Sequence, residues 1–371
     1  MTAPVSTAPI PFFAGEREFA ALRDELLPAI ERVLASGRTL QGPAVAEFER
    51  ALAASVGRRH AIAVGSGTDA LAFALLAHGV GPGDDVLVPA FSFVATASCV
   101  LRVGARPVFV DVDEDGLLRL DDAAAKATPA TRALIAVQLY GQMLSPAELE
   151  GFAAERGLVL VEDAAQALGA SAEGRACGAV GAASACSFDP TKILAAPGSG
   201  GAVLCDDDAL AERLRRLRWH GRDASGAYAE LGFNSQLPSA SAAALLVKLA
   251  RQPAWTARRA TVAARWSAVL EARGDGAVLA PRVLPGRTHV FHKYVVRARD
   301  RDGLRERLEA RGVPTLVHYA VPLHRQPVFA ACAPGACPGA DALAARVCSL
   351  PIHAFLTGEE VERVAEALAQ A

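Results

Sequence analysis

Lysine is rare in this chain of 371 residues. Of its 38 basic residues, 38 − 4 = 34 are arginines, and the only lysines are Lys126, Lys192, Lys248 and Lys293. Cysteine is also sparse: there are seven, an odd number, and no CxxC pair. This pattern argues against a disulfide framework and favours buried thiols in a reducing compartment.

Several other features that would indicate particular partners are missing. The formal net charge is −2 and no basic block appears, which argues against a nucleic-acid-binding surface. No uncharged apolar run reaches the roughly 18 residues that span a bilayer. Residues 1–18 lack the charged and then apolar segments of a signal peptide. We therefore expect a cytoplasmic protein with no nucleic-acid or membrane partner.

The chain is long enough to form two domains, because it exceeds the size at which a single core stops growing. From about residue 60 to 205, short β-branched runs alternate with longer Ala- and Leu-rich segments. This alternation predicts an α/β fold, a mostly parallel sheet covered by helices on both faces, with ligands bound at the carboxyl ends of its strands. The expected strands are residues 61–64, 85–88, 107–110, 133–139, 158–162, 183–188 and 201–205.

The pattern of expected helices and strands changes after about residue 250. Residues 257–273 read as a helix, 289–297 as a strand, 302–311 as a helix and 313–327 as a loop rich in Pro and His. A final helix at 357–370 has Thr357 as its N-cap. We expect a large domain over residues 1–250, and a smaller α+β domain over residues 251–371 with a hinge near Pro253.

Lys192 lies in the segment SFDPTKILAAP (187–197), after a strand-like run and before an apolar stretch. A lysine amine, unlike an arginine, can lose its proton and attack a carbonyl. Asp163, 29 positions earlier, closes another buried strand, where it could hold a protonated pyridine nitrogen. The pair suggests a Schiff-base lysine with pyridoxal 5′-phosphate (PLP) as cofactor. Alternatively, Lys192 is a solvated surface residue and Asp163 caps a helix.

The segment GSGTDAL (65–71) could bind the phosphate of such a cofactor. Glycine lets backbone N–H groups approach an anion, and Thr68 would add a hydroxyl at a helix N-terminus. Ser187 could donate a second hydroxyl to the same phosphate. Alternatively, the segment is an ordinary strand-to-helix turn with Thr68 as N-cap.

Two further side chains could contact a flat ring. Gln166, three residues after Asp163, could reach a ring hydroxyl, and Phe93, just past a strand end, could stack on the ring unless it belongs to the core. The eight histidines form no HxxxH or His/Cys cluster, so we expect no metal site. No GxSxG elbow supports Ser-His-Asp hydrolysis.

Together these segments resemble the DegT/DnrJ/EryC1/StrS family of PLP-dependent sugar aminotransferases. The resemblance covers nearly the whole chain. It implies the aspartate-aminotransferase-like fold type I, with a seven-stranded sheet in the large domain. The matching segments are GSGTDALAFALLAHGVGPGDDVLVPAFSFVATA (65–97), VFVDVDEDGL (108–117), VEDAAQALGA (161–170), SFDPTKILAAPGSGGAVL (187–204), LRWHG (217–221), GFNSQL (232–237), HKYVVR (292–297) and CSLP (348–351).

The resemblance also implies a role for each matching residue. Lys192 would bind the cofactor covalently and shuttle protons, while Asp163 would keep the ring nitrogen protonated. Gln166 would contact the ring hydroxyl and Phe93 would stack on the ring. The phosphate would be held by Gly67, Thr68, Ser187 and, from the neighbouring subunit of a homodimer, Asn234. The Pro- and His-rich loop resembles the part of the family that faces the sugar, although no residue there is given a role.

The chain departs from the family pattern at Ile193, at Ser199 and over residues 236–238. They leave the cofactor residues intact and bear on substrate choice and dimer contacts. The resemblance implies transfer of an amino group from an amino acid, L-glutamate by analogy, to C3 or C4 of a keto-sugar linked to a nucleoside diphosphate. The alternatives are a keto-cyclitol (inosose) acceptor and a non-catalytic regulator that keeps the fold.

Overall fold

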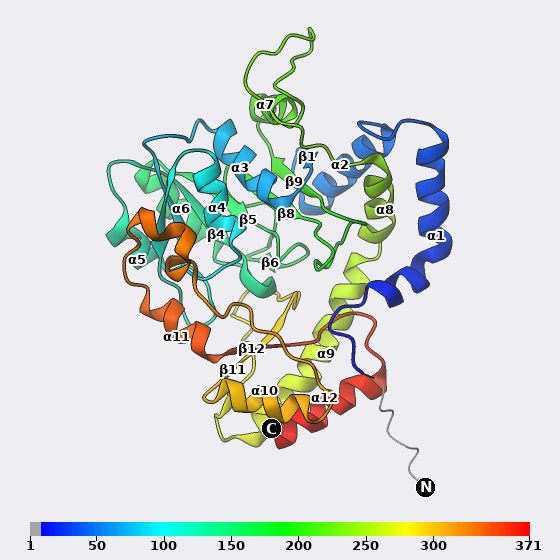
Figure 1. Ribbon diagram of the computed structural model, residues 1–371, viewed down its shortest axis with the longest axis vertical. Helices are drawn as coiled ribbons and strands as arrows, with labels where there is room; N and C mark the ends of the chain where they lie inside the picture. Colours follow the sequence, from blue (N-terminus) through cyan, green and yellow to red (C-terminus); the bar gives the residue numbers. More distant parts are fainter. Residues whose placement is uncertain (1–8) are drawn as a thin grey trace.

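A seven-stranded sheet forms the centre of the molecule (Figure 1). The structure, a computed structural model, describes residues 9–371. The strand order is β1-β9-β8-β5-β4-β2-β3, and only β9 within this sheet runs against its neighbours. The predicted α/β class and mostly parallel sheet are therefore confirmed. The strands are β1 (His60–Val64), β2 (Asp85–Pro89), β3 (Arg106–Val110), β4 (Thr131–Val137), β5 (Val159–Asp163), β8 (Ala183–Ser187) and β9 (Gly201–Cys205).

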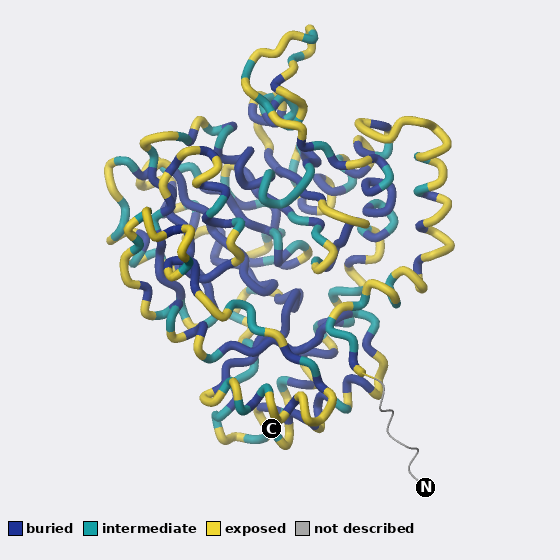
Figure 2. The backbone as a smooth tube through the Cα atoms, viewed as in Figure 1, coloured by how far each residue is buried: buried dark blue, intermediate teal, exposed yellow. Residues whose placement is uncertain are grey.

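Helices enclose the sheet, so its strands are buried along most of their length (Figure 2). Every residue of β2 and β9 is buried, as expected for strands covered on both faces. α3 packs over β5, β8 and β9 and also contacts α4 and α7. The helices of this part are α1 (Gly15–Ala35), α2 (Pro43–Val56), α3 (Gly67–Ala77), α4 (Ala95–Arg102), α5 (Leu120–Lys126), α6 (Pro146–Arg156), α7 (Asp208–Arg218) and α8 (Ser239–Leu249), and a small hairpin consists of β6 (Ser171–Ala172) and β7 (Arg175–Ala176).

A second, three-stranded antiparallel sheet lies in the C-terminal part. Its strands are β10 (Val278–Leu279), β11 (Tyr294–Ala298) and β12 (Val347–Leu350), and the surrounding helices are α9 (Gln252–Arg273), α10 (Arg301–Glu309), α11 (Pro338–Arg346) and α12 (Gly358–Gln370). This part has its own hydrophobic core, with Trp266 and Tyr294 fully buried in it. Ile10 also joins this core, so the N-terminal segment returns to the C-terminal part. The boundary between residues 250 and 251 stays a prediction.

Two strand predictions were wrong at their ends. The strand expected at 133–139 ends at Val137, because a 3-10 turn, η1 (Leu139–Gly141), follows, with Tyr140 at φ +59°. The strand expected at 289–297 begins only at Tyr294, because Phe291 adopts a left-handed conformation with φ +49°. The capping prediction for the last helix is confirmed: Thr357 and Glu360 form a capping box at α12.

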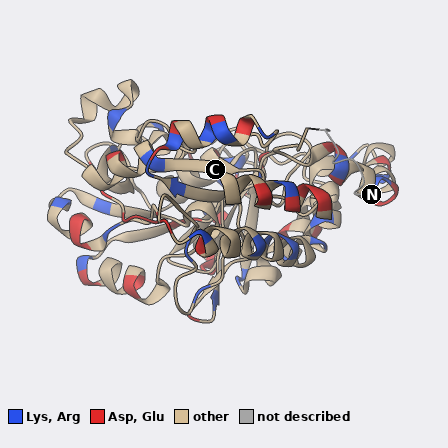
Figure 3. Cartoon of the chain, turned by 90° about the horizontal axis from the view of Figure 1, so that it is seen from below, with Lys and Arg blue, Asp and Glu red and all other residues tan. Residues whose placement is uncertain are grey.

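Charged residues of both signs are mixed along the helices at the lower end of the molecule (Figure 3). Ion pairs between helices contribute to this pattern, such as the one from Arg265 of α9 to Glu362 of α12 at 2.6 Å. No helix within residues 9–371 is long and apolar enough to cross a membrane. Within the same residues, no cluster of His, Cys, Asp or Glu is arranged to hold a metal ion.

Candidate active site

A cavity of about 370 Å³ lies at the carboxyl ends of β5 and β8. Parallel strands bring their carboxyl ends to the same edge of a sheet, so residues far apart in sequence meet here. Seven of the eight residues predicted from the sequence line this cavity: Gly67, Thr68, Phe93, Asp163, Gln166, Ser187 and Lys192. Asn234 is not among the lining residues.

Lys192 and Asp163 share this cavity. Lys192 lies in a turn after β8, where its backbone N–H donates to the carbonyl of Asp189 at 2.9 Å. Burial lowers the pKa of the Lys192 amine, and the charges of Asp163 and Asp189 oppose that effect. Asp163, the last residue of β5, is buried, and burial raises the pKa of its carboxyl group. The site therefore holds an amine that loses its proton more easily than an exposed lysine does.

Two donors hold the Asp163 carboxylate in place. The hydroxyl of Thr96 donates to Oδ2 at 3.0 Å, and the backbone N–H of Ala165 donates to Oδ1 at 3.1 Å. Both hydrogen bonds lower the pKa of Asp163 and so oppose the effect of burial. Because the Thr96 proton points at the carboxylate, the Ser92 hydroxyl donates to Thr96, at 2.9 Å. The sequence reasoning missed Thr96 and Ser92, although both belong to the segment at 65–97 that carried the resemblance.

The first turn of α3 lies at another side of the cavity. Its N-cap is Ser66, which accepts from the backbone N–H of Asp69 at 3.1 Å, so the interpretation of Thr68 as N-cap was wrong. The Thr68 hydroxyl is therefore not used for capping. A Cβ on Gly67 would lie 2.7 Å from the Cβ of Ser187. Glycine thus lets this turn approach the end of β8 and leaves a cradle of N–H and hydroxyl donors that fits an anion such as phosphate.

Gln166 is held at both ends of its amide. Its Oε1 accepts from the backbone N–H of Tyr140 at 3.0 Å, and its Nε2 donates to the Tyr319 hydroxyl at 3.2 Å. The Tyr140 hydroxyl in turn donates to the carbonyl of His318. Phe93 lies at the rim, 52% exposed, with its ring centroid 6.3 Å from that of Tyr319. PLP requires a carboxylate that can bind a cation, an amine, an anion cradle and aromatic rings, and all of these groups lie around this one cavity.

Asn234 lies on the segment between α7 and α8 and does not line this cavity. The residue is exposed, and its Oδ1 accepts from Nε2 of Gln236 at 3.1 Å. This segment protrudes at the top of Figure 1, after α7. The role expected for Asn234, in the site of a neighbouring subunit, stays a prediction.

Four other residues of the C-terminal part line the cavity and were given no role from the sequence: His292, Lys293, His318 and Tyr319. The signal for the last two was the Pro- and His-rich loop at 313–327, which pointed to a region without ranking its residues. For Lys293 the sequence carried a clearer indication, because lysine is rare in this chain and only four are present.

Comparisons with known proteins agree with this arrangement. The model of the DegT/DnrJ/EryC1/StrS aminotransferase family matches residues 20–369. The chain is 41% identical to a dTDP-3-amino-3,4,6-trideoxy-alpha-D-glucose transaminase of Streptomyces venezuelae, over 99% of this chain and 97% of that one. It is 40% identical to a pleiotropic regulatory protein of Geobacillus stearothermophilus, over 97% and 98% of the two chains.

The crystal structure of S. venezuelae DesV in complex with a ketimine intermediate is similar throughout. The TM-score is 0.94 at 41% identity, and 98% of each chain is covered. The predicted fold type and the predicted PLP cofactor are thereby confirmed. The chain belongs to the DegT/DnrJ/EryC1/StrS aminotransferase family and is a PLP-dependent aminotransferase.

Proposed function

We propose that the enzyme transfers an amino group from L-glutamate to C3 or C4 of a keto-sugar linked to a nucleoside diphosphate. The observation that carries this proposal is the shared cavity of Lys192 and Asp163, with the anion cradle at Gly67 beside them. The name of the Streptomyces relative, a transaminase of a dTDP-linked amino sugar, supports the acceptor class.

Each cavity residue has a distinct task in this proposal. Lys192 would hold PLP through its amine and Asp163 would hold the ring nitrogen, while the phosphate would lie in the cradle of Gly67, Thr68 and Ser187. When bound, PLP supplies an electron-withdrawing ring. Lys192 would add and remove the proton at the substrate carbon. Burial lowers the pKa of its amine, so a larger fraction of the amine is neutral and can accept a proton. Gln166 and Phe93 would orient the ring.

The active unit in this proposal is a homodimer in which Asn234 of one subunit completes the phosphate site of the other. The segment that carries Asn234 supports this arrangement, because Leu231 and Tyr228 on it are 87% and 74% exposed. Large apolar side chains this exposed are typical of a surface that another chain covers.

All seven cysteines are free, which suits the expected cytoplasmic location. We also propose that residues 1–250 and 251–371 form the two domains.

The acceptor class can be tested with a panel of substrates. Holoenzyme and L-glutamate are incubated with keto-sugar nucleotides that carry the ketone at C3 or at C4, and with keto-cyclitols, and the aminated product is detected by mass spectrometry. We expect turnover of at least one keto-sugar nucleotide. Turnover of keto-cyclitols alone would refute the proposal, as would failure of borohydride reduction to attach the cofactor to Lys192.

A regulatory role is the second candidate, because one relative is named a regulatory protein. The amine of Lys192 in the same cavity as Asp163 favours the enzyme, since a purely binding protein has no need for it. The variant Lys192→Ala separates the two: an enzyme loses its biological role, whereas a regulator keeps it.

A further inference from the structure

Lys293, immediately before β11, is a buried lysine whose amine has no counter-ion within the described residues. The residue is 6% exposed, and its ammonium group has no hydrogen bond or ion pair with any residue of the described range 9–371. Its neighbours are the rings of Phe13 and Phe12, whose centroids lie 4.6 Å and 5.7 Å from Nζ. Burying an unpaired ammonium group is costly. The position therefore calls for an anionic partner that the described chain does not supply.

Lys293 lines three cavities. The smallest, of about 30 Å³, also contains the carboxylates of Glu114 and Asp115, and both are already ion-paired with Arg282 and Arg297.

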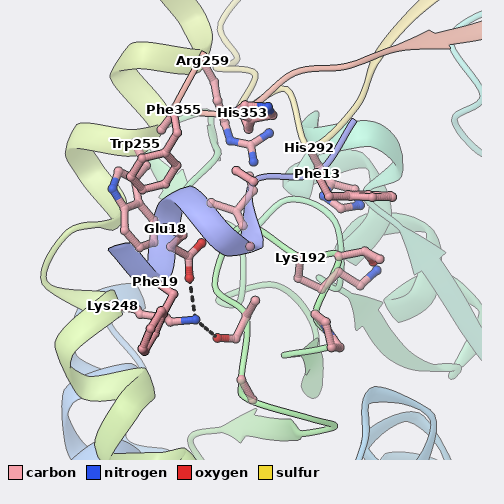
Figure 4. A pocket seen from close by; sticks show the side chains of 18 of the residues that line it. Phe13, Glu18, Phe19, Lys192, Lys248, Trp255, Arg259, His292, His353 and Phe355 are labelled. Carbon is pink, nitrogen blue, oxygen red and sulfur yellow. Dashed lines mark hydrogen bonds and ion pairs between the residues drawn. The ribbon is translucent and has the colours of Figure 1, made fainter. Parts of the chain in front are cut away.

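The other two cavities are larger. One is the catalytic cavity, and the second cavity, of about 280 Å³, lies between the start of α1, α9 and the segment after β12. Both cavities are also lined by Lys192 and His292. In Figure 4 the rings of Trp255 and Phe355 lie on one side of the second cavity and Lys192 on the other. A substrate at Lys192 is thus within the region that Lys293 lines.

The charges around Lys293 leave an excess of positive charge. Glu18, the carboxylate of the second cavity, is already paired with Lys248 at 2.5 Å (Figure 4). Arg259 is buried and donates from Nη1 to the carbonyls of Phe291 and Ile352 at 3.0 and 2.8 Å, and its Nε has no partner within the described chain. Burial and the charges of Lys192 and Arg259 lower the pKa of Lys293 to about 7, while Asp189 opposes them.

The nearby histidines do not offset this charge. Burial and the charge of Lys293 lower the pKa of His292 well below its usual range and that of His318 to about 4, so both are neutral at pH 7. Burial also lowers the pKa of His353, in the second cavity, to about 4. The Nε2 of this ring donates to the carbonyl of Pro11 at 3.0 Å. A carboxylate is an anion that these surroundings can bind, because it would pair with the otherwise unpaired ammonium group of Lys293.

We propose that Lys293 binds a carboxylate group of a substrate, foremost the side-chain carboxylate of the L-glutamate donor. The inference rests on the proposed transamination, in which an amino acid must come to Lys192. The bound carboxylate could also come from the acceptor, if the keto-sugar itself carries one. In a two-stage reaction the donor and acceptor steps can be measured separately, so an experiment can distinguish the sources.

The test uses holoenzyme with Lys293→Met, Lys293→Arg and a matched control, Lys126→Met. Lys126 is ion-paired with Asp122 at 2.8 Å and does not line any of these three cavities. The donor step is followed by cofactor absorbance, with L-glutamate or its neutral isostere L-glutamine and no acceptor. We expect Lys293→Met to raise the L-glutamate concentration that gives half the maximal rate of this donor step roughly tenfold to a hundredfold, the usual value of a hydrogen bond to a charged group. The half-saturating concentration of L-glutamine, whose side chain ends in a neutral amide, should change little, and Lys293→Arg should retain the preference for glutamate.

The pH dependence gives a second readout. Above about pH 7 an increasing fraction of Lys293 is neutral, so the KM of the wild-type enzyme for L-glutamate should rise with pH. This rise should be smaller in Lys293→Arg, because arginine keeps its charge. A purely structural lysine would produce neither this difference nor a change confined to one substrate.

Each outcome decides the inference. If Lys293→Met raises only the KM for an acceptor that bears a carboxylate, the carboxylate site is supported and the bound carboxylate belongs to the sugar. Unchanged donor and acceptor steps in Lys293→Met overturn it, and so does an equal loss of both steps accompanied by a lower unfolding temperature. The donor step needs no keto-sugar. The effect of Lys293→Met can therefore be measured even if no keto-sugar nucleotide proves to be an acceptor and the proposed function fails.

Discussion

The hydroxyl of Thr96, in the first turn of α4, donates a 3.0 Å hydrogen bond to Oδ2 of Asp163 at the end of β5. The two residues are 67 positions apart in sequence and both are buried. Burial alone favours a protonated carboxyl group, and this hydrogen bond favours the ionised form that can hold a cationic ring nitrogen. Thr96 is therefore expected to act through Asp163 as a positioning residue.

The variant Thr96→Val keeps the shape of the side chain and removes this hydrogen bond. We expect PLP affinity to fall about tenfold, because a hydrogen bond to a charged group contributes on the order of 1.5 kcal/mol. Cofactor titration of the apoenzyme measures the effect, and Ser98→Ala on the same helix is the control. Unchanged affinity in Thr96→Val would show that Asp163 does not need this donor.

The close approach of Gly67 to Ser187 gives a second prediction. Alanine at position 67 would place its Cβ 2.7 Å from the Cβ of Ser187, well inside normal contact. The turn must then shift, and with it the donors of the cradle. We expect Gly67→Ala to weaken PLP binding about fivefold to a hundredfold, since overpacking costs about 1–3 kcal/mol. Gly151→Ala, which would meet nothing within 4 Å, should bind PLP normally in the same titration.

The residues found by sequence reasoning are those that follow strands of the parallel sheet. Asp163 and Ser187 end β5 and β8, so a correct strand prediction was enough to bring them together. Tyr319 could not be found this way, because its contact with Gln166 spans 153 positions and depends on how the C-terminal part packs on the sheet. The left-handed conformation of Phe291, which delays the start of β11, likewise leaves no local pattern. Long-range packing, rather than periodicity, decides such positions.

Acid stability should depend on the pair formed by Arg17 and Glu360. This pair joins α1 to the capping box of α12 at 2.7 Å. The hydrogen bond with Arg17 lowers the pKa of Glu360 to about 2, below the value of about 4.3 in an unfolded chain. A lowered pKa means that the pair stabilises the fold above about pH 4.3 and ceases to do so as the pH falls towards 2.

The variant Glu360→Gln removes this contribution. At pH 7 we expect a free energy of unfolding lower by up to about 1 kcal/mol, because Arg17 is partly exposed and solvent weakens the pair. Near pH 2 the difference from the wild type should be much smaller. Urea unfolding at both pH values measures it, with the exposed Glu366→Gln on the same helix as control. A difference that stayed constant with pH would mean that the charge of Glu360 contributes nothing.

Whether Asn234 acts across a subunit interface can be decided by mixing two defective variants. Lys192→Ala lacks the amine, and Asn234→Ala is expected to lose most activity through weak phosphate binding. If Asn234 serves the neighbouring subunit, a mixed dimer has one site with both defects and one site with none. Random mixing should therefore restore roughly a quarter of wild-type activity, since half of the dimers are mixed.

If Asn234 served its own subunit instead, both sites of every mixed dimer would be defective. Activity would then stay at the level of the separate variants. Its position favours the first outcome, because within one chain Asn234 is exposed, lies on the segment after α7 and does not line the cavity that holds Lys192. The two variants should be unfolded and refolded together, because a stable dimer would otherwise exchange subunits too slowly. Mixing without refolding is the control and should restore nothing.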